Sequence, residues 1–410
     1  MPEFSSAAVV LSLVTGSVQD QAPGIAELRE ADPVCWLPGF DAWLVTRHED
    51  VRALFADPRL TTDPRAYERY TPPTVAGAAR WLTEMPFRST PADPFSLGRR
   101  LVLAALTPAA IARTEARIRE VVNEFAAPLH GRTGVVDLMG EFATPVAAAV
   151  IGRMLGVPPK GEDEIRFGFL ARRAARALRP LSLLSDRKRE ETESAAVEMG
   201  EYVLRLVQER RRTPREDLIS DLVRASNGNV RASDEEIVRV VASLVSAGNG
   251  TPGVACARAL RSLLLNPDQV ALLRSDRSLL ANAVGELMRY DTGLTLMPRY
   301  VLEDFELRGR AFKKGQLVAL SILGANRDPR VFPDNPEKLD IRRDTREAVS
   351  FGHGPHYCTG SNVALVEMRL MIQAALDFLP PNARLLEEKI RWSERGVMSQ
   401  IKDLPVDFGG

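Results

Sequence analysis

One stretch near the C-terminal end decides the fold, and it reads Phe351-Gly352-His353-Gly354-Pro355-His356-Tyr357-Cys358-Thr359-Gly360-Ser361-Asn362-Val363-Ala364. Two glycines and a proline precede Cys358, and the sequence predicts a helix that begins at Ser361. Backbone amides of a tight loop and of a helix N-terminus favour negative charge, so they lower the pKa of a cysteine beside them. We therefore expect Cys358 to be a thiolate that binds a soft or borderline metal ion.

Two other interpretations of this loop stay open from its residues alone. The loop is compatible with a glycine-rich turn that buries an ordinary cysteine. A zinc site is the other alternative, because His353 and His356 lie close to Cys358 in sequence. Structural zinc usually takes four ligands, however, and the remaining histidines, His48 and His130, lie far away along the chain.

The composition is that of an ordinary globular protein. The chain has 410 residues, of which 45% are hydrophobic and 26% are charged. Lys and Arg together number 54, as do Asp and Glu, so the net charge is zero and gives no general attraction to nucleic acid or to an anionic membrane. Three cysteines are a poor disulfide framework and are typical of a reducing cytosol.

The first residues do not resemble an export signal. Ser12 interrupts their apolar run, and Glu3 stands where a basic residue would be expected. No segment approaches the ~20 apolar residues that cross a bilayer. We therefore expect a cytoplasmic protein that works in solution without a membrane, and we take it to be a monomer.

Hydrophobic periodicity predicts a mainly α-helical protein with a small β portion, an α+β fold formed as one domain over residues 1–410. Residues 34–45 indicate a β-hairpin. Capping boxes are predicted at Thr46 with Glu49 and at Ser233 with Glu236. Residues 57–98 form a long loop, of a length that is often a binding loop or lid. Helices are predicted at 99–105, 109–128, 138–156, 161–178, 187–211, 215–225, 234–265, 276–290 and 361–379, and strands at 298–308 and 316–320.

The longest predicted helix contains an unfavourable stretch, Ala247-Gly248-Asn249-Gly250-Thr251-Pro252-Gly253. Glycine costs about 1 kcal/mol and proline about 3 kcal/mol inside a helix. One interpretation is that two helices meet here. The other is that the sequence breaks a local rule because function requires it.

The cysteine loop resembles the haem-binding signature of the cytochrome P450 family, in which fixed positions surround the iron ligand. The matching residues are Phe351, Gly352, Gly354, His356, Cys358, Gly360 and Ala364, while Val363 replaces the more usual leucine. The resemblance implies a triangular helical body with haem b between the long central helix and the cysteine loop. Cys358 would be the iron ligand and His356 would bind a haem propionate. An anionic sulfur ligand favours cleavage of the O–O bond.

Several residues elsewhere are similar to further elements of this family. Glu286 and Arg289 share a helix face, and Arg343 resembles the arginine that joins such a pair behind the haem. The pair would hold the cysteine loop in place, although Glu-x-x-Arg alone is an ordinary surface pattern. Arg99 and Arg299 resemble the family's propionate-binding arginines.

The stretch at 247–251 resembles the family's Ala-Gly-x-acid-Thr element above the haem. Ala247, Gly248 and Thr251 match, but Gly250 occupies the position of the acid. In the family, the acid and the alcohol relay protons to oxygen. We therefore hypothesise that proton delivery uses Asn249, water or a polar substrate, or that the reaction needs it less.

The resemblance also indicates where substrate and partners bind. Trp81, Met85 and Phe87 would line an apolar pocket, or they belong to the core. A basic cluster forms a solvated face or contacts an acidic substrate or carrier protein; it comprises Arg166, Arg172, Arg173, Arg176 and Arg179. Since the sequence contains no flavin or iron–sulfur motif, electrons would come from a ferredoxin fed by an NAD(P)H-dependent reductase.

The implied activity is that of a monooxygenase. It would activate O2 to hydroxylate or epoxidise a small or medium organic substrate, in the biosynthesis of a specialised metabolite. Because the acid is missing at Gly250, the same haem-thiolate centre could instead serve oxidative coupling, desaturation or a peroxide-driven oxidation. A non-catalytic haem sensor is a third alternative, which the long binding loop disfavours.

Overall fold

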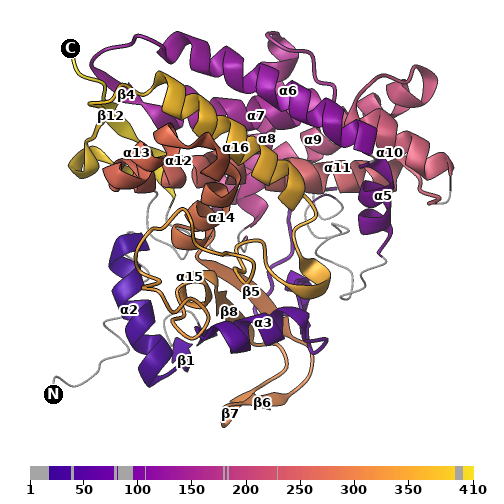
Figure 1. Ribbon diagram of the computed structural model, residues 1–410. Helices are drawn as coiled ribbons and strands as arrows, with labels where there is room; N and C mark the ends of the chain where they lie inside the picture. The colour runs from indigo at the N-terminus through magenta and orange to yellow at the C-terminus, as the bar shows by residue number, and fades with distance from the viewer. Residues whose placement is uncertain are drawn as a thin grey trace.

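The computed structural model describes residues 18–37, 41–77, 81, 96–106, 108–178, 181, 184–228, 230–392 and 400–410. Most of these residues are helical, as the periodicity predicts, and a small five-stranded sheet forms the largest β element. In the view of Figure 1 the long helices occupy the upper part of the molecule, and this sheet lies below them with α2, α3 and α15.

Most of the helices lie in a nearly continuous series between residues 97 and 290, and the others precede or follow it. They are α2 Val18–Ala31, α3 His48–Ala56, α5 Leu97–Ala105, α6 Pro108–Ala126, α7 Thr144–Met154, α8 Glu162–Ala174, α9 Asp186–Arg212, α10 Leu218–Asn227, α11 Asp234–Gly248, α12 Thr251–Leu264, α13 Pro267–Ser275, α14 Leu280–Tyr290, α15 Ile322–Asn326 and α16 Ser361–Phe378. A π-helical turn, Met139–Ala143, leads into α7.

The strands are short, and those in the described ranges form four small sheets. They are β1 Val34–Leu37, β2 Ala42–Val45, β3 Leu60–Thr61, β4 Val135–Asp137, β5 Leu296–Val301, β6 Phe305–Leu307, β7 Arg310–Phe312, β8 Leu317–Ser321, β9 Arg384–Leu385, β10 Arg391–Trp392, β11 Ile401–Asp403 and β12 Pro405–Asp407. The main sheet has the order β1-β2-β8-β5-β3, and its pairs are antiparallel except for β2 with β8. The predicted hairpin at 34–45 is confirmed by the antiparallel pairing of β1 with β2.

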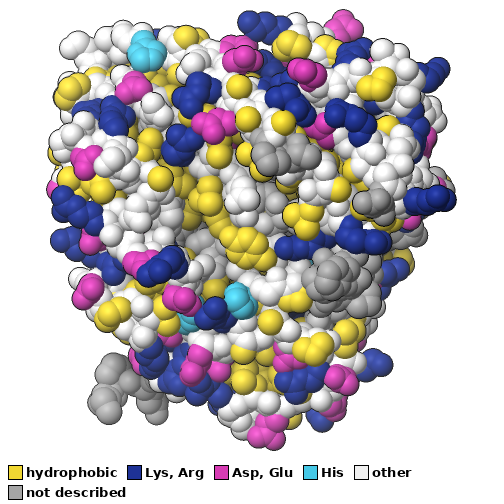
Figure 2. Space-filling model, turned by 45° about the vertical axis from the view of Figure 1, so that its right-hand side comes forward, with side chains coloured by type: hydrophobic (Ala, Val, Ile, Leu, Met, Phe, Trp, Pro, Cys, Tyr) yellow, Lys and Arg dark blue, Asp and Glu magenta, His cyan; other side chains and the backbone are white. Residues whose placement is uncertain are grey.

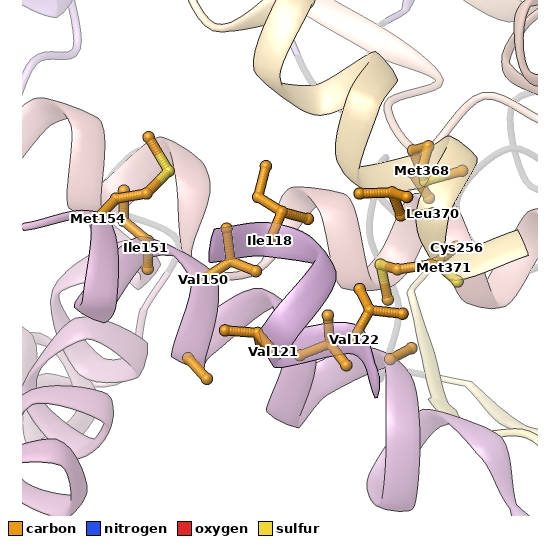
Figure 3. Packing of buried hydrophobic residues seen from close by; sticks show 14 of the residues in the cluster. Ile118, Val121, Val122, Val150, Ile151, Met154, Cys256, Met368, Leu370 and Met371 are labelled. Carbon is orange, nitrogen blue, oxygen red and sulfur yellow. The ribbon is translucent and has the colours of Figure 1, made fainter. Parts of the chain in front are cut away.

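A large apolar core lies within the helical part. It joins side chains of α6, α7, α12 and α16, among them Ile118, Val150, Cys256 and Met371, which are labelled in Figure 3. Each such side chain contributes about 1.5–3 kcal/mol when it is fully buried. This core fixes α12 against α16, so it sets the place of the loop from which α16 begins.

The structure corrects two local predictions. The predicted helix at 234–265 is divided into α11 and α12, which meet at Asn249 and Gly250. The capping box predicted at Thr46 and Glu49 is wrong, because α3 begins at His48 and the Thr46 hydroxyl donates to the Pro33 carbonyl instead. The second predicted capping box, Ser233 with Glu236, is confirmed at the start of α11.

The α11–α12 pair also forms a long apolar stretch. Among the described residues, Asp234–Leu264 alone is long and apolar enough to cross a membrane. In its apolar window 67% is buried inside the protein, as is typical of a core helix.

Candidate functional site

The loop that carries Cys358 is held in a tight path by its own backbone. The Cys358 amide donates to the Phe351 carbonyl at 3.0 Å, and a turn over Gly354–His356 closes between them. Gly354 has φ +70°, and a Cβ placed there would lie 2.9 Å from Cβ of Ala56 in α3. Only glycine meets both conditions, so this position fixes the loop against α3.

Cys358 differs from the other two cysteines in its surroundings. Cys35 and Cys256 are buried in the core, whereas the Cys358 side chain is exposed. Burial by the atoms around its sulfur raises the pKa of the Cys358 thiol, while the Gly360 amide and Arg99 act to lower it. The predicted lowering of this pKa is therefore wrong for the protein alone. Coordination to a metal ion would supply the missing stabilisation, because it deprotonates a thiol outright.

Three nitrogen-bearing side chains gather around the cysteine loop from separate elements. Arg99 of α5 donates to the carbonyls of Pro355 and Tyr357 at 3.2 and 3.3 Å. Arg299 of β5 lies over the ring of Phe55, 5.0 Å from its centroid, and donates to Pro298. Both arginines act electrostatically on His356, which places the three side chains near one another.

No acid in the described part of the chain balances the charge of these three side chains. Burial lowers the pKa of Arg299 to about 10, and no carboxylate among the described residues pairs with it. Burial lowers the pKa of His356 to about 4, assisted by Arg299 and Arg99. Nε2 of His356 is buried without a hydrogen-bond partner among the described residues. Buried cations and orphaned donors are costly unless an anion joins them, so the residues fit a haem whose propionates would lie here.

Behind the loop, Glu286 and Arg289 form a buried ion pair on α14. Both side chains are fully buried, and two hydrogen bonds of 2.6 and 2.8 Å join them. Arg343 donates to Glu286 Oε1 at 3.2 Å, and the Asp340 amide donates to the same oxygen at 3.0 Å. The structure thus brings together the three residues that the sequence singled out.

Asn326 connects this network to the cysteine loop and was missed by the sequence analysis. Arg289 donates to its backbone carbonyl at 2.7 Å. Its side chain accepts from the Val349 amide and donates to the Ser350 hydroxyl, at 2.8 and 2.9 Å. Ser350 directly precedes Phe351, so the contacts run without interruption from α14 to the loop. No sequence signal marked this asparagine, since it lies at the end of a short helix before coil.

The junction of α11 and α12 presents small side chains to open space. Ala247 is exposed although its helix lies in the core, and Gly250 and Thr251 are half-buried. A Cβ at Gly250 would meet no atom within 4 Å. The Thr251 hydroxyl donates to the Ala247 carbonyl at 2.6 Å, and Oδ1 of buried Asn249 has no partner among the described residues.

Two glycines flank this junction, and an added Cβ would meet different surroundings at each of them. A Cβ at Gly253 would lie 2.9 Å from the Ala143 carbonyl oxygen in the π-helical turn. At Gly248 the nearest atom would be Cδ1 of Ile151, at 3.4 Å. Close packing against the Ala143 carbonyl therefore requires glycine at 253, whereas a methyl group at 248 would make an ordinary contact with Ile151.

A buried acid on α16, Glu367, is a second residue that the sequence analysis missed. Burial raises the pKa of Glu367 to about 8, and its Oε1 has no partner among the described residues. Glu367 also raises the pKa of Cys256, after burial itself. The available signal was one carboxylate on the apolar face of the helix predicted at 361–379.

The residues predicted for the substrate side are only partly described. Trp81 is buried in the helical core, where its indole ring lies against Gly200 of α9. Met85, Phe87 and Arg179 lie outside the described residues.

In the basic cluster, two of the four described arginines have acidic partners on α9. Arg166 pairs with Glu198 and Arg176 with Glu191, each at 3.0 Å. No group of three or more His, Cys, Asp or Glu side chains in the described ranges could hold a metal ion, so His353 and His356 do not join Cys358 in a zinc site.

Known proteins resemble this chain over nearly its whole length. Residues 42–378 match the family described as Cytochrome P450. The chain is 31% identical to Cytochrome P450 107B1 of Saccharopolyspora erythraea, covering 95% of this chain and 96% of that protein. It is 33% identical to mycinamicin IV hydroxylase/epoxidase of Micromonospora griseorubida, with coverages of 93% and 94%. The solved structure of P450BioI, in complex with acyl carrier protein ligated to hexadec-9Z-enoic acid, superposes with a TM-score of 0.83 at 26% identity, covering 98% of this chain and 100% of that one.

Proposed function

This chain belongs to the cytochrome P450 family of haem-thiolate monooxygenases, and from that premise we propose that it hydroxylates or epoxidises a small or medium organic molecule of specialised metabolism. When bound, the haem supplies the redox chemistry that activates dioxygen, and an anionic sulfur ligand favours O–O cleavage. We place this activity in the cytoplasm, in a monomer folded as one domain over residues 1–410.

One observation carries the proposal: buried Arg299 lies beside the cysteine loop, His356 of that loop has a buried nitrogen without a partner, and neither pairs with an acid among the described residues. Cys358 would be the iron ligand, and Arg99, Arg299 and His356 would hold the propionates. The loop backbone from Phe351 to Gly360 would place the sulfur, and Ala247 and Gly248 would leave room on the opposite side. This division of roles leaves each of these side chains with a partner.

Thr251 is the hydroxyl that we assign to the oxygen-binding side. Its bond to the Ala247 carbonyl holds it at the junction of α11 and α12. Because Gly250 brings no carboxylate, protons would reach this hydroxyl through Asn249, water or the substrate. Oxidative coupling, desaturation or peroxide-driven oxidation is the second candidate function, favoured by this missing acid.

The carbon-monoxide difference spectrum of the reduced protein tests the ligand assignment. The unchanged protein is expected to give the absorbance band of a thiolate-ligated haem, and Cys358→Ser is expected to abolish it. Cys35→Ala is the matched control and should retain the band, because Cys35 is buried in a core away from this loop. A thiolate band that survives Cys358→Ser would refute the assignment. Incorporation of label from isotopic O2 into product separates the monooxygenase from the second candidate.

We propose that electrons arrive from a ferredoxin, itself reduced by an NAD(P)H-dependent reductase. The surface beside the cysteine loop suits such a partner, because it is basic and partly apolar. Arg100 and Leu103 of α5 are exposed, the latter by 57%, and Tyr357 of the loop is 40% exposed. Arg99 ties α5 to this loop through its two carbonyl contacts, so both parts form one surface.

We further propose that the substrate is either free or presented by an acidic carrier protein at α8. Ile165 and Phe169 are exposed by 75% and 44% on that helix. Arg173 covers Phe169 at 4.1 Å, and Arg172 is exposed without an ion-pair partner among the described residues. The double change of Arg172 and Arg173 to Glu should weaken binding of an acidic carrier-bound substrate, measured by spin-state titration. Unchanged affinity would contradict presentation by an acidic carrier protein and would favour a free substrate.

A further inference from the structure

A buried ion pair joins α12 to the end of α14. Nη1 of Arg258, on α12, donates to Oδ1 of Asp291 at 2.7 Å, and both side chains are almost fully buried. The Ser262 hydroxyl, one turn further along α12, donates to the other oxygen of Asp291 at 3.3 Å. Asp291 directly follows α14. Removal of one partner of a buried pair leaves an uncompensated charge, so this contact fixes the place where the chain leaves α14.

Arg258 has a close counterpart on the next turn of α12, Arg261. Cζ of Arg258 lies 5.5 Å from the centre of the Trp392 ring in β10, and Cζ of Arg261 lies 5.8 Å from it. Arg261 is also buried, and it pairs with Glu387. The two arginines are therefore alike in burial, in the ring that they contact and in having an acidic partner. They differ in the place of that partner, because Asp291 begins the connection between α14 and β5, whereas Glu387 lies between β9 and β10.

The chain that follows the ion pair runs past α12 and then enters β5. A Cβ at Gly293 would lie 3.7 Å from Cα of Ala255, which is one turn beyond Thr251 on α12. Strand β5 then carries Arg299, which lies near the cysteine loop. Residues 291–296, which we call the α14–β5 connection, therefore lead from the neighbourhood of Thr251 toward that of Arg299.

Part of this stretch is not sealed in the core. Gly293 and Leu294 of the α14–β5 connection are half-buried, and Pro298 is exposed although β5 pairs with both β8 and β3. The proposed function gives the space between Thr251 and Arg299 to the haem and the substrate. The α14–β5 connection would then form one wall of that space.

We propose that Arg258 is a positioning residue, which through Asp291 fixes the α14–β5 connection against α12 and so sets the room that a substrate has beside the haem. This inference rests on the proposed function, which places haem and substrate there. Because Arg258 is fully buried, it would act through the connection rather than by touching the substrate. Loss of the ion pair would let the connection shift relative to α12, while the cysteine loop keeps its own contacts to α3 and α14.

The first test is hydrogen exchange of the backbone amides in residues 292–296. Arg258→Gln removes the charge that holds Asp291, so this exchange should become severalfold faster. Arg261→Gln is the matched control and should leave the exchange near its original rate. The double variant Arg258→Gln with Asp291→Asn leaves neither partner as an unpaired buried charge, so it serves where the single variant does not fold, and it should also exchange faster.

The second test compares two ligands that bind ferric haem iron through an imidazole nitrogen. Imidazole is small and reports on the iron itself, whereas phenylimidazole adds a ring that needs room beside the haem. The ratio of their dissociation constants, measured by absorbance titration, should change severalfold in Arg258→Gln and in the double variant. The dissociation constant of imidazole should stay near its original value in these variants, and Arg261→Gln should leave both constants unchanged.

The outcomes separate a positioning role from a merely structural one. Unchanged exchange in the Arg258→Gln and double variants would overturn the hold of Arg258 on the connection. Faster exchange with an unchanged ratio would overturn its effect on the substrate space, and so would an equal loss of affinity for both ligands, which marks a general structural effect. A failure of the proposed function would appear differently, as the absence of a thiolate-type carbon-monoxide spectrum in the unchanged protein.

Discussion

The three cysteines show how surroundings decide the chemistry of one residue type. Burial raises the pKa of Cys35 to about 11 and raises that of Cys256 still further, so both thiols stay protonated at neutral pH. Cys358 is an exposed residue; burial of its sulfur raises the pKa of this thiol too, but the Gly360 amide and Arg99 act to lower it. Its position before a helix, rather than its residue type, makes it the ligand candidate.

Glu367 gives a prediction about stability and pH. Burial raises the pKa of Glu367 from its ordinary value of 4.5 to about 8. The folded protein keeps this proton up to about pH 8, whereas the unfolded chain releases it above about pH 4.5. The free energy of unfolding should therefore fall as pH rises through this window, by about 1.4 kcal/mol per pH unit from this group.

Glu367→Gln should remove that dependence, because an amide does not titrate. Between pH 5 and 8 the variant should gain up to about 4 kcal/mol of stability relative to the original protein. Urea unfolding at several pH values measures the difference. Glu115→Gln, a surface change, serves as the control. Parallel stability curves for Glu367→Gln and the original protein would contradict the prediction.

At the residue scale, the sequence supplied the candidates wherever a motif fixes a residue type. Cys358, His356, Glu286 and Arg343 were named in advance, and the structure places the last two 3.2 Å apart. Asn326 and Glu367 were missed, because their importance comes from tertiary contacts. The pKa of Cys358 was mispredicted, since burial of its sulfur outweighs the effect of the Gly360 amide and Arg99.

At the junction of α11 and α12, the low helix propensity of glycine and proline conflicts with the helical pattern on either side. Thr251 and Pro252 begin α12, and the Thr251 hydroxyl binds the carbonyl of Ala247 across the break. Pro252 brings no amide hydrogen to the interrupted ladder. The cost of glycine and proline indicated a break, but the sequence could not distinguish a kink from two separate helices.

Gly250→Asp tests whether this junction limits proton delivery. The side chain should fit without strain, because a Cβ there meets no atom within 4 Å. If delivery is impaired, the variant should divert fewer reducing equivalents to peroxide and convert more NAD(P)H into product. Product formed and NAD(P)H consumed are measured together, with Gly248→Ala as a steric comparison. No change in coupling or in rate would reject impaired delivery.

The buried ion pairs of Glu286 with Arg289 and Arg343 predict an effect on the free energy of unfolding. Glu286→Gln leaves Arg289 charged and buried without its counter-ion, which should cost about 3–5 kcal/mol of unfolding free energy. Glu115→Gln breaks surface contacts to Arg369 and Arg119 and should cost less than about 1 kcal/mol. Denaturant unfolding measures both. Equal losses in the two variants would argue against a special role for the network.

Elements were predicted best where their signals are local. The Ser233–Glu236 capping box formed because both partners belong to the first turn of α11. The Thr46 box failed because Pro33, thirteen residues earlier, takes the hydroxyl. Helices α2 and α13 were not predicted as separate elements.

Across the whole molecule, charge is balanced and dispersed. Figure 2 shows basic and acidic side chains interspersed over the visible face, in keeping with a net charge of zero. A docking partner would therefore find only local fields, such as the basic surface around Arg99 and Arg100. Specific docking is then short-ranged and sensitive to salt.

This balance leads to a prediction about electron transfer. Reduction of the haem by a ferredoxin should slow as ionic strength rises from low to physiological values, because the contact depends on a few local charges. Arg100→Glu should slow reduction at low salt and flatten the salt dependence. Stopped-flow absorbance measures the rates, and Arg346→Glu, which changes an exposed arginine outside α5 and the cysteine loop, is the control. Identical salt dependence in Arg100→Glu would place the docking surface elsewhere.

The wide separation of Arg99, Arg299 and Cys358 along the sequence has a consequence for the synthesis of the protein. A ribosome makes the three in that order, and the cysteine loop leaves it only after most of the helical layer has been synthesised. Until then, a haem that needs all three side chains has no complete binding site. We therefore expect cofactor capture at the end of synthesis or after it, and we expect a cell short of haem to accumulate haem-free chains that depend on chaperones.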